Sequence, residues 1–299
     1  MNSDRAVLLV GHGTIADLGD VPEFLQRIRR GRPASAELVE EIRRRYRAIG
    51  RSPLLDVTES LAQKLSGRLQ MTVRVAMRFW EPLVERVVEE LVASGVRKLC
   101  VLPVAPFSVH VYTDVVARAL EATARGRQAP ALVRVEPYGS DPALVAAQAA
   151  LVRPLLGGKA PQETSLLVTA HSLPSAVIAS GDPYQRQFET SAAAICAALG
   201  WPGEVVYQSQ GADGGDWLGP TLEQAFDAAS AAGKRGVVVA PVGFLADHVE
   251  TLYDLDIEAR DRAASRGLAF ERAPALGDAD ALRDALQGVV ERAFTVGTG

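Results

Sequence analysis

The chain has 299 residues, of which 48% are hydrophobic and 23% charged, close to the averages of soluble globular proteins. This composition excludes a disordered or collagen-like chain, because enough apolar surface exists to offset the chain entropy lost on folding. The 32 Lys and Arg residues against 36 Asp and Glu give a net charge of −4. That balance argues against nucleic acid as a partner, since a nucleic-acid footprint needs a broad basic face.

The length suits two domains of about 150 residues each. No run of about 18 apolar residues occurs, so we expect no membrane span, while peripheral contact with a membrane stays open. The N-terminal stretch MNSDRAVLLVGHGT lacks the longer apolar core and the cleavage site of a secretory signal. We therefore expect a cytoplasmic protein.

The strand and helix patterns alternate along the whole chain. Strands are predicted at Ala6–Val10, Thr72–Ala76, Lys98–Pro103, Leu132–Val135, Ser165–Ala170, Glu204–Gln208, Gly236–Pro241 and Leu268–Arg272. Helices are predicted, among others, at Ala36–Ile49, Pro82–Ser94, Leu144–Leu156, Gln185–Leu199, Thr221–Ala232 and His248–Arg266. Short apolar strands that alternate with amphipathic helices predict an α/β fold of parallel sheets covered on both faces.

The segment Gly157–Glu163 contains glycine and proline without hydrophobic periodicity, which makes it the best candidate linker. We expect an N-terminal domain over residues 1–156 and a C-terminal domain over residues 164–299. Three features recur in the same order in both halves, which indicates duplication of one α/β unit. They are an apolar strand leading to His12 or His171, a Trp-Pro pair (Trp80 and Pro82, Trp217 and Pro220), and Pro-Val followed by His110 or His248.

All four histidines of the chain follow predicted strands, where ligands of α/β folds bind. His171 precedes a proline-containing loop, and Asp182 is placed to cap the helix that follows it. A single histidine at such a place is more often structural than functional. Its pairing in one crevice with the acidic residues described next favours a functional role.

Glu250, Asp254 and Glu258 recur every four residues, which places them on one face of the helix predicted from His248. Three like charges on one face need compensation by solvent, a cation or a proton. The same spacing is typical of a solvated acidic face near a helix N-terminus, which the helix dipole favours. Spacing alone does not separate the two interpretations.

The remaining motifs give weaker evidence about function. Residues 207–220 read as a pocket-lining loop, and no nucleotide-binding fingerprint occurs in the chain. Cys100 and Cys196 lie in apolar contexts typical of core residues, and two thiols are too few for most iron–sulfur clusters. Arginines concentrate between residues 27 and 53, which suits a substrate with carboxylate arms, a solvated helix face or contact with membrane phosphates. These arginines are Arg27, Arg29, Arg30, Arg32, Arg43, Arg44, Arg45, Arg47 and Arg51.

Four C-terminal stretches resemble the ferrochelatase family: TAHSLP, GDPYQRQFETSAAAI, YQSQGADGGDWLGPTL and APVGFLADHVETLYDLDIEA. RIRRGRPASAELVEEIRRRYRAIGRSPL resembles the N-terminal segment of its coproporphyrin-type bacterial branch. The resemblance covers most of the chain and keeps the motif order. It implies two Rossmann-like halves, each a parallel four-stranded sheet flanked by helices, with a porphyrin cleft between them.

The resemblance implies a lyase-class metal chelatase of haem biosynthesis that inserts Fe²⁺ into protoporphyrin IX or coproporphyrin III. His171 and Glu250 match the catalytic histidine and glutamate, and the metal contacts fall on His171, Glu250, Asp254 and Glu258. The substrate-binding positions fall on His12, Arg29, Arg45, Tyr46, Ser52, Tyr112 and Trp217. Insertion requires that two pyrrole protons leave as the cation arrives, and imidazole serves both as a base near neutral pH and as a metal ligand.

The sequence departs from the family at two places. His12, in VGHGTI, stands where coproporphyrin-type members have tyrosine, and VGHGT resembles the opening of sirohydrochlorin and cobalt chelatases. Ala105–Thr113 departs from the family's PxYSxxT pattern, which leaves the roles of His110 and Tyr112 open. A sirohydrochlorin-type chelatase and a non-catalytic porphyrin or haem carrier therefore remain alternatives. We expect a monomer whose partners are porphyrin and ferrous iron, with iron as substrate and no permanently bound cofactor.

Overall fold

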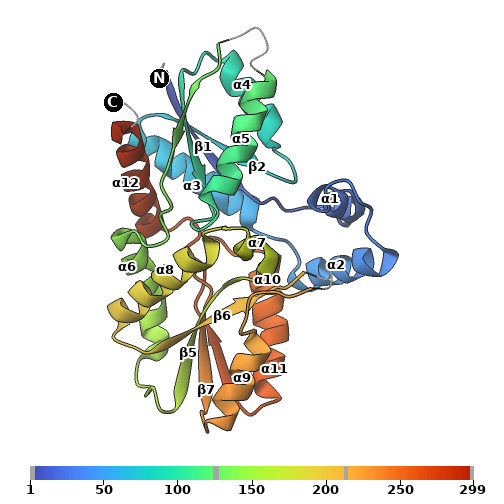
Figure 1. Ribbon diagram of the computed structural model, residues 1–299, viewed down its shortest axis with the longest axis vertical. Coiled ribbons are helices and arrows are strands. Elements are labelled where there is room, and N and C mark those ends of the chain that lie inside the picture. The colour runs from blue at the N-terminus through green and yellow to red at the C-terminus, as the bar shows by residue number, and fades with distance from the viewer. Residues whose placement is uncertain (1–3, 124–127, 212–214, 297–299) are drawn as a thin grey trace. The chain divides into compact units, whose positions relative to one another are not determined.

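The structure is a computed structural model that describes residues 4–123, 128–211 and 215–296 (Figure 1). The chain forms two compact units. Unit 1 contains residues 1–138 together with 277–299, and unit 2 contains residues 139–276.

Each unit contains one parallel four-stranded sheet, as predicted. The first has the order β2-β1-β3-β4, with β1 at Arg5–Gly11, β2 at Thr72–Met77, β3 at Lys98–Pro103 and β4 at Ala131–Arg134. The second has the order β6-β5-β7-β8, with β5 at Thr164–His171, β6 at Gly203–Gln208, β7 at Gly236–Ala240 and β8 at Ala269–Arg272. Each predicted strand is present within a residue or two of its expected ends.

Helices flank both sheets (Figure 1). In unit 1 they are α1 (Val21–Ile28), α2 (Ala36–Ile49), α3 (Leu54–Leu69), α4 (Val84–Ala93), α5 (Val109–Thr123) and α12 (Asp280–Val296). In unit 2 they are α6 (Pro142–Leu156), α7 (Ser175–Ala179), α8 (Tyr184–Leu199), α9 (Leu222–Ala231), α10 (Val249–Leu252) and α11 (Arg260–Ala264). Short 3₁₀ and π-helical segments, η1 (Leu18–Asp20) and η2 (Asp254–Ala259), complete the set in the described residues.

The two sheets have the same strand order relative to the chain, which supports the predicted duplication. A residue near the end of the second strand, Met77 in β2 and Tyr207 in β6, also makes the same bond in each unit. The amide of Met77 donates to the carbonyl of Pro82 at 2.7 Å, and the amide of Tyr207 donates to the carbonyl of Pro220 at 2.8 Å. The Trp-Pro pairs seen in the sequence therefore belong to matching turns.

These matching turns and the strand registers align the two units residue by residue. Met77 lies opposite Gly11 and Tyr207 lies opposite Ala170, so the residues that follow each of them are equivalent. After β3 and β7, equal spacing from a proline supplies the remaining matches. The equivalent pairs are His12 with His171, Arg78 with Gln208, His110 with His248, Tyr112 with Glu250 and Thr113 with Thr251.

The division between the units differs from the expected linker at Gly157–Glu163 and falls between Tyr138 and Gly139. The hydroxyl of Tyr138 donates to the carbonyl of Pro103 in unit 1, whereas the carbonyl of Gly139 accepts from Ser191 in unit 2 at 2.7 Å. Helix α6 therefore belongs to unit 2, where it packs against α8. The expected linker is a turn within that unit.

Helix α12 returns to unit 1 and packs against α3. The carboxylate of Asp278, just before α12, accepts a hydrogen bond from the Ser60 hydroxyl at 2.5 Å. It also forms an ion pair with Lys64 at 2.9 Å. Both donors lie on α3. These contacts join the C-terminal segment of unit 1 to α3.

Apolar residues of the central strands form the core of each unit. In unit 1, Leu8 and Val101 pack with residues of α4 and α5, and in unit 2, Leu167 and Val239 pack with α9. Cys100 is buried as expected, but Cys196 is only partly buried, because α8 turns it toward the edge of the sheet beside Gly203. In the part of the chain that the structure describes, no helix is both long and apolar enough to cross a bilayer.

Candidate functional site

His171 is the last residue of β5, at the carboxyl end of the second sheet. The first residue of the loop after His171, Ser172, is hydrogen-bonded to two other segments. The Ser172 amide donates to the Gln208 carbonyl at 2.7 Å, and the Ser172 hydroxyl donates to the Leu218 carbonyl at 2.9 Å. The Tyr184 hydroxyl, at the start of α8, donates to the His171 carbonyl at 2.8 Å. The backbone that carries the imidazole is therefore fixed by three neighbouring segments.

The N-cap residue of α8 is Pro183 instead of the predicted Asp182, whose carboxylate still accepts from the Tyr184 amide at 2.9 Å. The His171 ring makes a short contact through Nδ1 with the Ser172 carbonyl. A carbonyl only accepts hydrogen bonds, so Nδ1 carries the proton. In the neutral ring this leaves the lone pair on Nε2, the nitrogen that faces Glu250.

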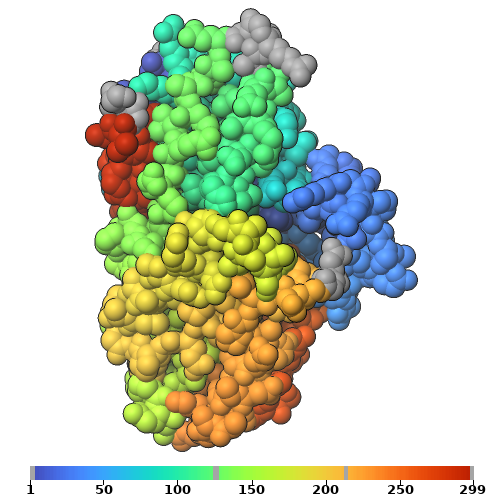
Figure 2. All heavy atoms as spheres, viewed as in Figure 1, coloured from blue at the N-terminus to red at the C-terminus, as the bar shows by residue number. Residues whose placement is uncertain are grey.

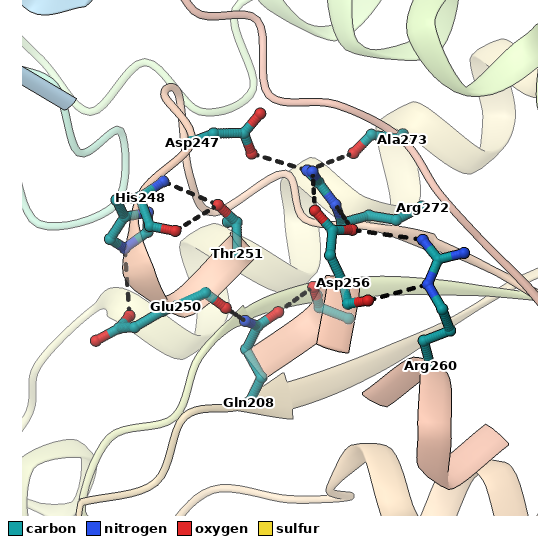
Figure 3. A network of polar contacts seen from close by, with 10 residues as sticks. Gln208, Asp247, His248, Glu250, Thr251, Asp256, Arg260, Arg272 and Ala273 are labelled. Carbon is teal, nitrogen blue, oxygen red and sulfur yellow. Dashed lines mark hydrogen bonds and ion pairs between the residues drawn. The ribbon is translucent and has the colours of Figure 1, made fainter. Parts of the chain in front are cut away.

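Glu250 lies between two histidines. One carboxylate oxygen is 3.6 Å from Nε2 of His171. The other is 3.4 Å from Nε2 of His248, as Figure 3 shows. The Glu250 side chain is 30% exposed, the His171 side chain 33% and the His248 side chain 17%. The three groups are thus partly desolvated yet open to a substrate, an arrangement able to pass a proton from ring to carboxylate to ring.

The end of β6 fixes the backbone beneath Glu250. The Gln208 side chain accepts from the Thr169 hydroxyl at 2.7 Å and donates to the Glu250 carbonyl at 3.3 Å (Figure 3). The next residue, Ser209, donates its hydroxyl to the Asp254 carboxylate at 2.6 Å. Two consecutive residues at one strand end therefore fix the backbone of Glu250 and the carboxylate of Asp254.

The helix predicted from His248 to Arg266 is not continuous. Its middle is the π-helical segment η2, in which the Glu258 amide donates to the Tyr253 carbonyl, five residues back, at 3.0 Å. The expectation of one continuous α-helix is therefore wrong, because a π turn holds more residues than an α turn. A π segment within a helix is frequent at functional sites.

Arg272, on β8, ties the two sides of this segment together (Figure 3). It donates to Asp247 at 2.8 Å and makes a two-bond contact with Asp256 at 2.7 Å and 2.7 Å. Burial alone would lower the pKa of Arg272, but its hydrogen bonds and its attraction to these two carboxylates raise that pKa above its ordinary value. Asp247 precedes His248 and Asp256 lies in η2, so one cation braces the backbone on both sides of Glu250.

The outer carboxylates of the predicted stripe have partners. Glu258 lies 3.7 Å from the Arg262 guanidinium, which also pairs with Glu223 on α9. Among the described residues, no three His, Cys, Asp or Glu side chains are grouped closely enough to hold a metal ion. Asp254 and Glu258 are thus placed beyond Glu250 along the chain without forming a closed ligand cage with it.

The equivalent place in unit 1 has different side chains. The exposed His12 ring lies edge-on to Phe79, with ring centres 4.8 Å apart. The Arg78 guanidinium lies 4.6 Å from the centre of the Phe79 ring and 5.9 Å from that of the buried Tyr112. We call His12, Arg78 and Tyr112 strand-end site 1, and His171, Gln208 and Glu250 strand-end site 2.

Several arginines of the arginine-rich segment of unit 1 pair with glutamates on their own helices, α1 and α2, which form the blue surface at the right of Figure 2. Arg45 donates to Glu41 at 2.8 Å, and Arg47 donates to Glu40 at 2.6 Å. The hydrogen bond from Arg45, with further support from Arg44, holds the pKa of Glu41 below its ordinary value. Arg29 is the C-cap residue of α1.

The other predicted substrate contacts differ in exposure. Tyr46 is buried with its hydroxyl 3.0 Å from that of Thr14, and Ser52 is buried at 3.5 Å from the Leu54 amide. Trp217 is half-buried and pairs through its backbone with Pro174 in the loop after His171. Part of the loop that carries Trp217, residues 212–214, lies outside the described residues.

Sequence reasoning did not assign three residues of these sites: His248, Arg272 and Arg78. His248 carried a signal, because it stands two residues before Glu250 and repeats the position of His110. Arg272 and Arg78 carried none, since only tertiary structure brings them to Asp247, Asp256 and Tyr112.

Comparison with known proteins gives a consistent result. A sequence model of the Ferrochelatase family matches residues 4–294. A ferrochelatase of Acidobacterium capsulatum is 34% identical, with 96% of this chain and 93% of the relative aligned. A ferrochelatase of Herpetosiphon aurantiacus is 34% identical over 97% of this chain and 99% of its own. A coproporphyrin III ferrochelatase of Anoxybacillus flavithermus is 32% identical over 95% of this chain and 94% of its own.

Among solved structures, SirB from Bacillus subtilis with Fe³⁺ superposes with a TM-score of 0.63 at 13% identity, covering 98% of both chains. The sirohydrochlorin chelatase SirB of Bacillus subtilis subspecies spizizenii in complex with cobalt gives a TM-score of 0.58 at 14% identity. The match covers 97% of this chain and 94% of that structure. At these identities the likeness concerns the fold.

Proposed function

The chain belongs to the ferrochelatase family, and we propose that it inserts Fe²⁺ into a porphyrin with release of two protons, as a step of haem biosynthesis. The observation that carries this proposal is Glu250 held between His171 and His248 at 3.6 Å and 3.4 Å, at the end of β5. Such a constellation combines a base, a proton acceptor and ligands suited to a divalent cation.

We assign the removal of pyrrole protons to His171 and Glu250. The Nε2 lone pair of His171 takes a proton from a pyrrole nitrogen, because Nδ1 is engaged with the Ser172 carbonyl. The imidazolium then lies beside the Glu250 carboxylate, which stabilises the charge and accepts the proton. Two such transfers leave a porphyrin dianion that balances the charge of Fe²⁺.

We assign the traffic of protons and metal to Asp254 and Glu258, which follow Glu250 along η2. Carboxylate oxygens and imidazole suit ferrous iron without holding it as tightly as thiolate sites hold softer metals. His248 is the inner partner of Glu250 in this route. Asp254→Asn and Glu258→Gln should slow insertion less than Glu250→Gln and should make the rate more dependent on metal concentration.

We propose that unit 1 supplies most of the porphyrin contacts, through His12, Arg29, Arg45, Tyr46, Ser52 and Tyr112, and that Trp217 of unit 2 adds an aromatic wall. Guanidinium groups bind carboxylates in two-bond geometry. The substrate is a porphyrin with propionate arms, protoporphyrin IX or coproporphyrin III. The second carries four such arms and the first two, so the number of engaged arginines separates them.

A sirohydrochlorin-type chelatase is the second candidate, and one observation favours it. His12 occupies in unit 1 the position of His171 in unit 2, within the VGHGT sequence typical of that group. The conserved order of the C-terminal motifs and the family match over residues 4–294 favour ferrochelatase instead.

One assay separates the candidates. Purified protein is mixed anaerobically with Fe²⁺ and protoporphyrin IX, coproporphyrin III or sirohydrochlorin, and the spectrum of the metallated product is followed. We expect turnover with one of the two porphyrins, and turnover with Zn²⁺ or Co²⁺ in place of Fe²⁺. Turnover with sirohydrochlorin alone would support the second candidate, and stoichiometric binding without metal insertion would support a carrier.

The cytoplasmic location and the monomeric state also stand as proposals. Cell fractionation tests the first, and size-exclusion chromatography with light scattering tests the second.

A further inference from the structure

Arg78 is a half-buried cation without an acidic partner in the part of the chain that the structure describes. Its guanidinium lies against the rings of Phe79 and Tyr112, at 4.6 Å and 5.9 Å from their centres. Arginines of comparable burial elsewhere in the protein are paired, as Arg272 is with Asp247 and Asp256. A desolvated guanidinium costs free energy unless an anion compensates it.

The charged groups around Arg78 increase this need. Burial and the positive charges of Arg118 and Arg30 lower the pKa of Arg78, against the opposing effect of Tyr112. Three cations thus influence one another at the end of the first sheet. Both aromatic rings lie close to the guanidinium carbon, and the N–H donors of a guanidinium suit an anionic acceptor.

The helix beside Arg78 adds positive potential. Tyr112 lies in the first turn of α5, a helix of 15 residues with no acidic residue in that turn. In unit 2 the equivalent first turn, that of α10, carries Glu250. The N-terminus of a helix attracts anions through its dipole and its unbonded amides. Unit 2 supplies its own carboxylate at this place, and unit 1 does not.

We propose that strand-end site 1 binds an oxyanion, a carboxylate or a phosphate group, with Arg78 as the charged ligand. Phe79 and Tyr112 hold the guanidinium in place, and the exposed His12 ring, stacked on Phe79, borders the site. The oxyanion comes either from solution or from a carboxylate arm of the tetrapyrrole. The second source rests on the proposed function, and the first does not.

The first arm of the test uses inorganic phosphate. Thermal unfolding is measured in sodium phosphate and in sodium chloride of equal ionic strength, because a ligand that binds the folded state raises the melting temperature. Arg78→Gln introduces the residue that unit 2 has at this position. Arg78→Lys keeps the charge without the planar donors, and Arg86→Gln is the control, since Arg86 is exposed on α4 beside Glu90.

If the site takes a free anion, phosphate protects the wild type and Arg86→Gln, protects Arg78→Lys partly, and loses its effect in Arg78→Gln. The second arm measures equilibrium binding of metal-free coproporphyrin III and of its tetramethyl ester in detergent by fluorescence quenching. If the site takes a substrate arm, Arg78→Gln weakens binding of the acid about fivefold or more, as expected for a lost charge-assisted contact, and leaves the ester within about twofold.

Phosphate protection that is equal in the wild type and Arg78→Gln, together with unchanged porphyrin affinity, would overturn the proposal. So would the absence of any phosphate effect combined with equal weakening of acid and ester. Neither arm requires turnover. A protein that binds phosphate through Arg78 but inserts no iron would sink the proposed function and leave this inference standing.

Discussion

At the end of the first sheet, Arg78 and Tyr112 stand where the second sheet has Gln208 and Glu250. Strand order, register and the backbone hydrogen bond from the second strand to a proline carbonyl are the same in both units. Only the side chains differ, and they differ in charge. Unit 2 places a carboxylate between two imidazoles, whereas unit 1 places a guanidinium between two aromatic rings.

This difference teaches how a duplicated fold divides one reaction. A carboxylate beside neutral imidazoles accepts protons and attracts cations, so strand-end site 2 suits the chemical step. A guanidinium at the same backbone position attracts anions and repels metal, so strand-end site 1 suits the substrate's acidic groups. Substitutions in unit 2 should therefore lower kcat, and those in unit 1 should raise KM.

The largest effect is expected at the equivalent histidines. His171→Ala should abolish insertion of iron while the fold is retained, since the ring lies on a strand end outside the core. His12→Ala, the matched change in unit 1, should leave kcat within about tenfold, because Tyr112 stands there in the position that Glu250 has in unit 2. Anaerobic initial rates and circular dichroism check both variants. Equal losses in the two would break the comparison.

The next largest effect is expected for Glu250→Gln, which should lower kcat by about 10²–10⁴-fold, the scale for a lost acid–base group. The amide keeps the size of the side chain but removes its charge and its ability to accept a proton. Tyr112→Phe is the matched control in unit 1 and should change kcat by less than about tenfold. A Glu250→Gln enzyme with near-normal kcat would return the carboxylates of this helix to a solvated acidic face.

A smaller effect is expected at Arg272, as a positioning residue for Glu250 and His248. Arg272→Met should lower kcat about tenfold, as for residues that orient reacting groups, with KM within about twofold. Asp247 and Asp256 would lose their cation, and their negative charge should move the acidic limb of the pH–rate profile to higher pH.

Arg272→Lys separates orientation from charge. It should recover the pH profile, because the cation returns, but recover kcat only in part, because lysine lacks the two-bond geometry with Asp256. A loss of melting temperature without any change in the pH profile would identify Arg272 as structural only.

Arg29→Ala and Arg45→Ala should each raise KM for the porphyrin several-fold and leave kcat nearly unchanged. Arg47→Ala is the control on α2, because the Arg47 side chain is 54% exposed, against 27% for Arg45. Steady-state kinetics with coproporphyrin III would measure both constants. Unchanged KM values in both variants would assign these arginines to ion pairs such as that of Arg45 with Glu41.

Most of the fold followed from local signals. The central strands are continuous buried apolar runs, and such runs between amphipathic helices specify a parallel sheet with little ambiguity. His171 and Glu250 were found because they stand next to such strands or at helix starts, where the sequence records their position. The actual contact between them, 3.6 Å, required the structure.

What escaped prediction depends on contacts between distant segments. The π-helical turn η2 follows from bonds of Asp254 to Ser209 and of Asp256 to Arg272, which lie on other elements. The unit boundary at Tyr138 depends on where α6 and α12 pack, and both have ordinary helical sequences. The opposite charges of the two strand-end sites also became visible only when the registers were aligned.

The smallest expected effect concerns how each unit is assembled. Unit 2 is one continuous stretch, whereas unit 1 must recruit α12 from the other end of the chain. Asp278 joins α12 to α3 through Ser60 and Lys64, and these hydrogen bonds hold the pKa of Asp278 below its ordinary value. A carboxyl whose pKa is lowered by folding stabilises the protein above its unfolded pKa, about 4, and loses that contribution as the pH falls through its folded value.

Asp278→Asn should therefore lower the melting temperature at pH 7 by about 1–3 °C, the scale for one exposed contact in a chain of this size. The gap between variant and wild type should close as the pH falls below about 4, because the wild-type carboxyl is then protonated too. Asp280→Asn is a control within α12, since Asp280 pairs with Arg283 of the same helix. Thermal scans from pH 3 to about pH 8 measure the gap. A gap that stays constant with pH would mean that the carboxylate's charge does not hold α12, and that apolar packing against α3 alone recruits it.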